Sequence, residues 1–285
     1  MNPTSIGEIL ERAVGTLEAA GVPGARVDAE LLLGFVLGLS RGGVQAKVAV
    51  DASVTVDDVM TISELVERRA SREPLQHITG RAPFRSLELA VGPGVFVPRP
   101  ETEQVAQFAI DALRDVASPE PRAVDLGTGS GAIALALATE VPHARVWGVE
   151  VSPVAFVWTK QNFRLADNAT PVFTDLAIAL PELDGTVDVV ISNPPYIPAG
   201  AIPRDPEVRL FDPEIALYGG EDGLDLVRRV STTALRLLHA GGTLVIEHGE
   251  LQAEEIAALL RADGWSAVAS HRDLLGRDRA TTAIR

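Results

Sequence analysis

The sequence predicts an α/β protein with a mostly parallel β-sheet, preceded by a small all-helical domain. The first observation is that, from about residue 122 onward, short apolar runs alternate with longer segments whose apolar residues have helical spacing. Such alternation is typical of strands and helices that form a mostly parallel sheet. The second observation is that apolar residues before residue 73 recur at helical spacing, which predicts helices there.

Composition narrows the classes of protein to which the chain can belong. Its 285 residues include 25 Lys and Arg against 39 Asp and Glu, so the net charge is −14. A broad nucleic-acid-binding face needs clustered cations, so this charge disfavours a nucleic-acid partner. The chain has no cysteine, which excludes disulfides and thiolate metal sites, and its five scattered histidines show no metal-ligand spacing. We therefore expect no metal.

The chain also lacks the signals of membrane proteins and secreted proteins. No apolar run approaches the ~20 residues that a membrane-spanning helix needs. The N-terminus has no basic region followed by an apolar core, which a secretion signal would have. We therefore expect a cytoplasmic protein that has no membrane partner.

Residues 1–73 are predicted to form a helical bundle that docks a partner or acts as a lid. The first helix ends at the break over 21–24, where the sequence is Gly-Val-Pro-Gly. Asp28 is predicted to cap a second helix, and the glycine pair 42–43 to interrupt the chain again. A third helix is expected within 55–72. Helices joined by such short connections pack as antiparallel neighbours.

Residues 74–100 are predicted to be a hairpin linker. Two short apolar segments, 75–80 and 84–89, are interpreted as strands on either side of a turn. A helix is expected to begin at Glu101, because acidic side chains in a first turn interact favourably with the helix dipole. The third domain is then predicted to span 101–285.

Seven strands and four helices are predicted in the region that begins near residue 122. The predicted strands cover 122–126, 144–149, 171–174, 186–192, 241–248, 265–270 and 279–284. The predicted helices cover 130–140, 153–166, 223–239 and 252–262. No helix separates the last two strands, so we expect an antiparallel edge there. Ligands of such sheets bind beyond the carboxyl ends of the parallel strands, and four candidate site residues follow strands in this way: Gly127, Glu150, Asp175 and Asn193.

A glycine-rich turn follows the first of these predicted strands. It consists of Gly127, Thr128, Gly129, Ser130 and Gly131. Glycines adopt positive φ and let a ligand approach the backbone closely. About 20 residues further on, Glu150 ends the second strand, where an acid can accept hydrogen bonds from ribose hydroxyls. The G-x-G-x-G spacing predicts S-adenosylmethionine (SAM), which has no pyrophosphate, as the cofactor, with S-adenosylhomocysteine as its product.

A stiff corner follows the predicted strand over 186–192. This proline corner consists of Asn193, Pro194, Pro195 and Tyr196. The two prolines fix φ and remove two backbone donors, so the strand must stop there. The corner offers free carbonyl groups, a side-chain amide and an aromatic ring. It suits a planar NH₂ group, because the oxygens can accept two N–H bonds while the ring covers one face.

Six segments resemble one family. They are residues 73–80, 96–103, 125–131, 191–198, 214–224 and 273–279. From about residue 70 to its end, the chain resembles the release-factor glutamine methyltransferases of the PrmC/HemK type. The resemblance implies a seven-stranded, mostly parallel, Rossmann-like methyltransferase sheet with an N-terminal helical domain and a β-hairpin linker. It also implies N5-methylation of the glutamine in the Gly-Gly-Gln motif of peptide chain release factors, which would be the partners.

Two of the remaining candidate residues, Asp175 and Arg99, have two interpretations each. Asp175 is interpreted either as an acid that faces the adenine of SAM or as an ordinary strand end. Family members often have tryptophan after this acid, whereas this chain has Leu176. Arg99 and Thr102 are expected to line the SAM pocket, although Arg99 could instead brace the linker. Glu247, which ends a predicted strand near the expected site, is interpreted as structural.

The expected chemistry depends on alignment. Asn193 Oδ1 and the Pro194 carbonyl are expected to accept the two N–H bonds of the substrate amide, and Tyr196 to pack against it. Two alternatives remain open. The same corner serves the exocyclic NH₂ of adenine or guanine in nucleic-acid methyltransferases. The second alternative is a regulatory protein that binds SAM without catalysis, although such a protein does not need a corner that binds an NH₂ group.

Overall fold

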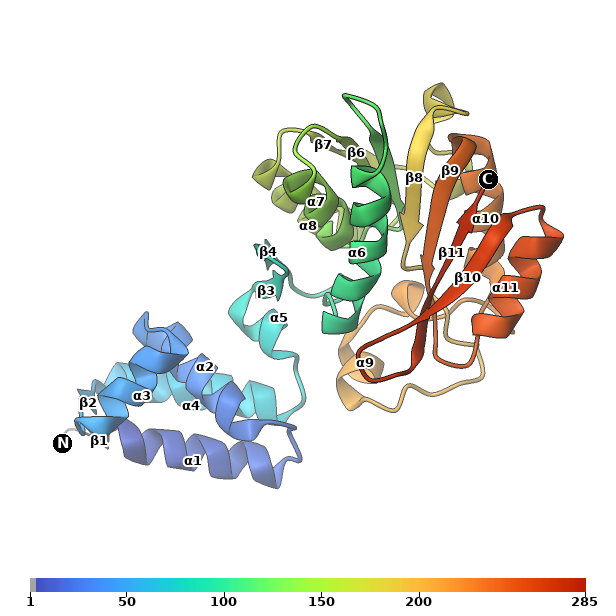
Figure 1. Ribbon diagram of the computed structural model, residues 1–285. Coiled ribbons are helices and arrows are strands. Elements are labelled where there is room, and N and C mark those ends of the chain that lie inside the picture. The colour runs from blue at the N-terminus through green and yellow to red at the C-terminus, as the bar shows by residue number, and fades with distance from the viewer. Residues whose placement is uncertain (1–3) are drawn as a thin grey trace. The chain divides into compact units, whose positions relative to one another are not determined.

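The structure, a computed structural model, describes residues 4–285 (Figure 1). Two units divide the chain. One contains the residues up to Gly80 together with Arg204–Phe211, and the other contains Arg81–Pro203 and Asp212–Arg285. Within residues 4–285, no helix is both long enough and apolar enough to cross a membrane.

Helices dominate the first unit. They are α1 (Ile6–Ala19), α2 (Ala25–Leu37), α3 (Arg41–Ala49), α4 (Val56–Ala70), α5 (Leu75–Thr79) and α9 (Pro206–Phe211). Two short strands, β1 (Thr4–Ser5) and β2 (Ser53–Val54), pair antiparallel. The core of this unit consists mainly of buried aliphatic side chains from α1, α2 and α4, among them Leu17, Leu33 and Ile62.

Two details of the predicted bundle are wrong. Asp28 does not cap the second helix, because α2 already begins after Gly24, which has φ +69°. Asp28 lies in the first turn, and its Oδ2 accepts a 2.7 Å hydrogen bond from Arg69 Nε. The glycine pair 42–43 does not interrupt the chain but lies inside α3, where the Ser40 hydroxyl accepts the Gly43 N–H at 3.1 Å. This N-cap offsets the low helix propensity of the glycines.

A segment from late in the sequence belongs to the helical unit. Arg69, whose side chain is only 5% exposed, pairs with Asp28 and with Glu207 of α9, at 2.7 and 2.6 Å. Arg72 also pairs with Glu207, at 3.0 Å. A buried guanidinium needs such partners, because an unpaired charge in the interior is strongly destabilising. The pairing therefore ties α9 to α4.

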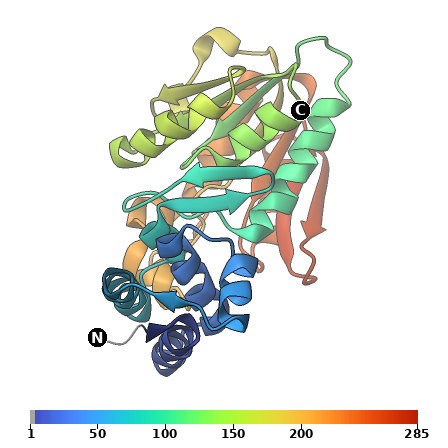
Figure 2. The same cartoon turned by 90° about the vertical axis from the view of Figure 1, so that its left-hand side faces the viewer.

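The linker hairpin lies later in the chain than predicted. Residues 75–79 form the single-turn helix α5, and the strands are β3 (Arg81–Phe84) and β4 (Leu87–Ala90), seen in teal in Figure 2. The helix begins after Pro74 and ends at Gly80, which has φ +71°. These two residues favour a capped helical turn over an extended strand.

The second unit contains a seven-stranded sheet, as predicted. Its strands are β5 (Arg122–Leu126), β6 (Arg145–Glu150), β7 (Ala169–Phe173), β8 (Val187–Ser192), β9 (Leu238–Glu247), β10 (Ser266–Arg272) and β11 (Asp278–Ile284). They lie in the order β10-β11-β9-β8-β5-β6-β7. The five strands from β7 to β9 are parallel, whereas β11 runs antiparallel to both β9 and β10. The predicted antiparallel edge is confirmed.

Helices cover both faces of this sheet (Figure 1). They are α6 (Pro100–Arg114), α7 (Ala132–Glu140), α8 (Pro153–Asn162), α10 (Asp225–Leu237) and α11 (Ala253–Ala262). Alternate residues of β8 enter different cores: Val189 packs with α6 and α7, and Val190 packs with α10 and α11. Both faces of the central strands are therefore buried, which explains their continuous apolar runs.

Candidate active site

The predicted site residues gather at the carboxyl edge of the parallel strands. Glu150 is the last residue of β6, while Gly127, Asp175 and Asn193 follow β5, β7 and β8 within two residues. The Ser192 hydroxyl donates a 2.6 Å hydrogen bond to the Leu126 carbonyl, which ties the ends of β8 and β5 together. The glycine-rich turn and the proline corner are therefore neighbours.

The glycine-rich turn is shaped by positive φ. Gly127, Gly129 and Gly131 have φ of +78°, +56° and +89°, a region that other residues adopt only with strain. A Cβ at Gly127 or Gly129 would meet no atom within 4 Å, so open space lies over both residues. A Cβ at Gly131 would come within 2.7 Å of the Phe163 ring, which makes glycine necessary for packing there.

Glu150 is held by the turn and by the start of α8. Its Oε2 accepts the Gly129 N–H at 2.9 Å, and its Oε1 accepts the N–H groups of Val151 and Ser152 at 2.9 and 2.7 Å. These backbone donors hold the carboxylate in one orientation. A carboxylate oxygen can accept more than one hydrogen bond, so Glu150 retains acceptor capacity for a diol.

Asp125 was not singled out from the sequence, yet it lies beneath the turn. Its Oδ2 accepts the Thr128 hydroxyl at 2.6 Å and the Ala134 N–H at 3.2 Å. Burial raises the pKa of Asp125 to about 7, and the nearby charge of Glu150 adds to the shift. An acid one residue before the end of an apolar strand is the sequence signal that could have identified it.

Two polar residues of α8 were also missed. The Thr159 hydroxyl donates to the Gly129 carbonyl at 2.6 Å, and Asn162 Nδ2 donates to the Ser130 carbonyl at 2.8 Å. The Asn162 amide also pairs with both backbone groups of Ala90 in β4. One buried asparagine therefore joins the hairpin to the glycine-rich turn. Only burial reveals this role, since polar residues are common on helices.

The proline corner is braced by two other segments. Gln252 Nε2, at the start of α11, donates to the Tyr196 carbonyl at 3.0 Å. The Ile197 N–H donates to the Leu217 carbonyl, and the Gly219 N–H donates to the Ile197 carbonyl, both at 2.9 Å. Burial raises the pKa of Tyr196 to about 12, so its hydroxyl stays neutral.

Arg99 and Thr102 lie at the start of α6. Arg99 Nη2 pairs with the buried Asp212 at 2.7 Å, and the Arg99 guanidinium lies 4.9 Å from the centre of the Phe96 ring. These contacts favour the interpretation that Arg99 braces the linker. Thr102 is 4% exposed and lies beside Glu247, the last residue of β9.

Asp175 takes part in local structure. Its Oδ1 accepts the Ala177 N–H at 2.9 Å and pairs with Arg229. The Arg229 guanidinium lowers the pKa of Asp175. The half-buried Leu176 opens the short helical turn over Leu176–Ile178 and packs against the core on the α10 side. The structure thus gives Asp175 a capping role.

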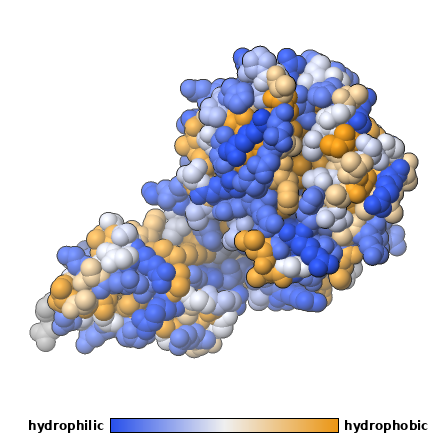
Figure 3. Space-filling model, in the orientation of Figure 1, coloured by the Kyte–Doolittle hydropathy of each residue, from blue (hydrophilic) through white to orange (hydrophobic). Residues whose placement is uncertain are grey.

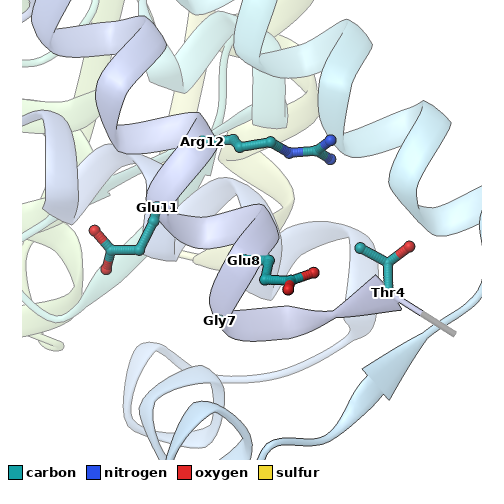
Figure 4. A pocket seen from close by; sticks show the side chains of 5 residues that line it. All are labelled: Thr4, Gly7, Glu8, Glu11 and Arg12. Carbon is teal, nitrogen blue, oxygen red and sulfur yellow. The ribbon is translucent and has the colours of Figure 1, made fainter.

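A hollow on the helical unit does not resemble a binding site. Figure 4 shows its lining, which consists of Thr4, Gly7, Glu8, Glu11 and Arg12. The charged side chains point in different directions rather than toward a common centre. Glu11 is already paired with Arg26 at 2.9 Å. The candidate chemistry therefore lies at the edge of the sheet.

Comparisons with known proteins indicate the family of this chain. The family described as "PrmC N-terminal domain" matches residues 8–80, and "Methyltransferase small domain" matches residues 86–211. The release factor glutamine methyltransferase of Streptomyces coelicolor is 49% identical, over 95% of this chain and 95% of its own. The 4-amino-L-phenylalanine/4-methylamino-L-phenylalanine methyltransferase of Streptomyces pristinaespiralis is 39% identical, over 99% of this chain and 95% of its own.

A solved structure supports the fold alone. The hMettl16 catalytic domain in complex with a MAT2A 3′UTR hairpin aligns with a TM-score of 0.55 at 19% identity, over 78% of this chain and 80% of its own. The chain is a SAM-dependent methyltransferase, and its glycine-rich turn follows β5 of the seven-stranded sheet. Its likeness to the release factor enzymes over nearly its whole length goes further: the chain belongs to the release factor glutamine methyltransferase family.

The residues at the edge fit SAM, the cofactor that the family and fold imply. Open space over Gly127 and Gly129 leaves room for a ligand against the backbone. Glu150, at 8% exposure, presents a fixed carboxylate beside that space. Gly127, Gly129 and Glu150 would therefore hold the nucleoside part.

Proposed function

We propose that this chain transfers a methyl group from SAM to the side-chain amide nitrogen (N5) of the glutamine in the Gly-Gly-Gln motif of peptide chain release factors. The name of the Streptomyces coelicolor relative supports this substrate. The observation that carries the proposal is the braced corner over 193–196, adjacent to the glycine-rich turn. The proposed place of action is the cytoplasm, where release factors work.

The corner would act on the substrate by alignment. An amide nitrogen is a poor nucleophile, because its lone pair is delocalised into the carbonyl. When bound, SAM supplies an electrophilic methyl carbon on a positively charged sulfur. We assign the two amide N–H bonds to Asn193 Oδ1 and the Pro194 carbonyl, so that the nitrogen faces that carbon. Fixing reacting groups in this way can contribute ~7–11 kcal/mol.

The same two oxygens would stabilise the reaction as it proceeds. Positive charge develops on the amide nitrogen during methyl transfer, and electronegative acceptors aimed at it lower the barrier. Tyr196 would pack against the amide plane as a neutral ring, in line with its raised pKa. The proton would leave to water after transfer, so the proposed steps need no metal.

Asn193→Ala tests the role of the corner. Loss of one acceptor should lower kcat by about 100-fold or more, the cost typical of removing one preorganised transition-state contact. SAM affinity should stay within about threefold, because Asn193 is assigned to the substrate amide. Single-turnover kinetics would give the rate, and calorimetry would give the SAM Kd. Near-normal turnover would refute the assignment.

The substrate itself can be tested with labelled SAM. Purified enzyme would be incubated separately with release factor, with total RNA and with 4-amino-L-phenylalanine, the class of substrate named for the Streptomyces pristinaespiralis relative. We expect label on release factor, and mass spectrometry should place the methyl group on the glutamine of Gly-Gly-Gln. Label on RNA or on the free amino acid alone would contradict the proposal, and binding of SAM without any label would indicate a regulatory protein.

Surface features support a protein substrate over a small amine. On α2, Val27, Leu31 and Phe35 lie four residues apart on one helix face and are 38%, 38% and 47% exposed. Hydrophobic surface is visible on the helical unit in Figure 3. In the turn between β10 and β11, Leu274 and Leu275 are 94% and 78% exposed. Grouped exposed apolar side chains are typical of interaction surfaces. We assign the docking of the release factor to the α2 face.

A further inference from the structure

Glu247 lies beside the proposed catalytic amide. It ends β9, and the parallel register pairs Ser192 of β8 with Ile246 of β9, so the next residues, Asn193 and Glu247, are neighbours. Val245 packs into the core on the α6 side, and side chains alternate along a strand, so Glu247 faces the same side. Its side chain lies among the first turn of α6, β11 and the corner.

The surroundings of Glu247 contain buried polar atoms without hydrogen bonds. Glu247 Oε2, Thr102 Oγ1 and Arg279 Nε are all buried and have no hydrogen-bond partner within residues 4–285. Unpaired buried polar groups are costly and need an explanation. Burial raises the pKa of Glu247 to about 7, and Thr102, Arg279 and Asn193 oppose that shift.

An asparagine amide can be oriented in two ways, and only one serves the reaction. Oδ1 must face the substrate, so Nδ2 must have another acceptor. An ionised carboxylate only accepts hydrogen bonds, so Glu247 favours the orientation that directs Nδ2 toward itself. We propose that Glu247 is a positioning residue that fixes the Asn193 amide so that Oδ1 faces the substrate. This inference rests on the proposed role of the corner.

Protonation of Glu247 should reverse this preference. A carboxylic acid can donate to Asn193 Oδ1 and compete with the substrate for it. The charged groups that also face Glu247 or Tyr196 are Glu101 and Arg99 near the start of α6 and Arg279 of β11. Of these, Arg279 favours the ionised form of Glu247 and Glu101 disfavours it. Activity is therefore expected to rise as the pH rises through about 7.

The test compares Glu247→Gln with Glu247→Leu on the acceptor that the wild-type enzyme methylates. Gln does not titrate and, like the protonated acid, can donate to Asn193 Oδ1, so kcat at pH 8 should fall toward the value of the wild type at low pH and the rise in kcat/KM between about pH 6 and 8 should disappear. Leu offers no acceptor, so kcat should fall by about tenfold or more at every pH, which corresponds to about 1.4 kcal/mol. SAM Kd should change little in both variants.

The exposed Glu250, three residues further on, provides the matched control. Glu250→Gln should keep the wild-type pH profile. An unchanged kcat in Glu247→Leu, or a persisting pH rise in Glu247→Gln, would overturn the proposal. If the Leu variant does not fold, the pH profile of the Gln variant still decides. Absence of label on release factor with the wild-type enzyme would instead count against the proposed function.

Discussion

At the residue scale, two acids on neighbouring strands have opposite surroundings. Glu150 accepts three backbone N–H bonds, which hold its carboxylate in one orientation. Asp125 accepts a hydroxyl and one N–H but is 1% exposed, so the loss of water dominates and its pKa rises to about 7. Glu150 thus lies beside the open space over Gly129, whereas Asp125 supports the turn from below.

Asp125→Asn tests the cost of that burial. The folded-state pKa of Asp125 lies above its unfolded value of 3.8, so its contribution to stability is lost as pH rises from 3.8 to about 7. The Asn variant cannot ionise. Its free energy of unfolding, relative to the wild type, should therefore rise by about 1.4 kcal/mol per pH unit in that window. Urea unfolding at several pH values measures this, and a constant difference would contradict the raised pKa.

At the element scale, the proline corner depends on chain segments that contribute no proposed catalytic group. The stretch from Leu217 to Gly223 lies against the backbone of 195–197, and Gln252 holds the Tyr196 carbonyl from the start of α11. A Cβ at Gly223 would lie 2.4 Å from the Tyr196 carbonyl oxygen. This close approach gives a physical reason for glycine in the family motif.

Gly223→Ala should therefore damage catalysis more than cofactor binding. The new methyl group would push the Tyr196 carbonyl out of place, and kcat should fall by about tenfold or more, since small shifts of reacting groups carry large penalties. Gly264 also has positive φ, at +96°, but a Cβ there meets nothing within 4 Å. Gly264→Ala is the matched control and should keep kcat. Equal losses in both variants would indicate general strain rather than displacement of the corner.

At the scale of the whole molecule, the two units are interleaved along the chain. The segment over 204–211 follows the corner in sequence, yet it belongs to the helical unit through the pairing of Glu207 with Arg69 and Arg72. The helical unit also carries the exposed α2 face, to which we assign docking. Binding and chemistry would thus use different units of one chain.

Replacing Val27, Leu31 and Phe35 with Ser tests the docking face. KM for intact release factor should rise by about tenfold or more, because burial of such side chains contributes about 1.5–3 kcal/mol each when complete. Activity on a short Gly-Gly-Gln peptide should be unchanged. Val50 and Met60, in the same unit, are 73% and 68% exposed, and their replacement with Ser is the control. An unchanged KM for intact factor in the triple variant would refute this docking face.

Short-range sequence patterns identified the strands of the sheet, but they misread two segments of the first 80 residues and did not single out the buried polar residues. The strands β5 and β8 were predictable because buried parallel strands are continuous apolar runs. The glycine pair at 42–43 and the apolar segment at 75–80 were misread, since capping by Ser40 in one case, and by Pro74 and Gly80 in the other, overrode the local preference. Asp125, Asn162 and Gln252 could not be ranked above other polar residues, because only their burial and partners distinguish them.

The amino-acid order alone determined the class of fold, the glycine-rich turn, the acid at Glu150 and the corner at Asn193. These features are local, since φ restrictions, side-chain alternation and strand ends depend on residues close in sequence. Tertiary structure decided which distant groups support them. The neighbourhood of Asn193 and Glu247 follows from strand register, and the partners of Arg69 follow from packing. Burial and register arise only when segments far apart in the chain meet.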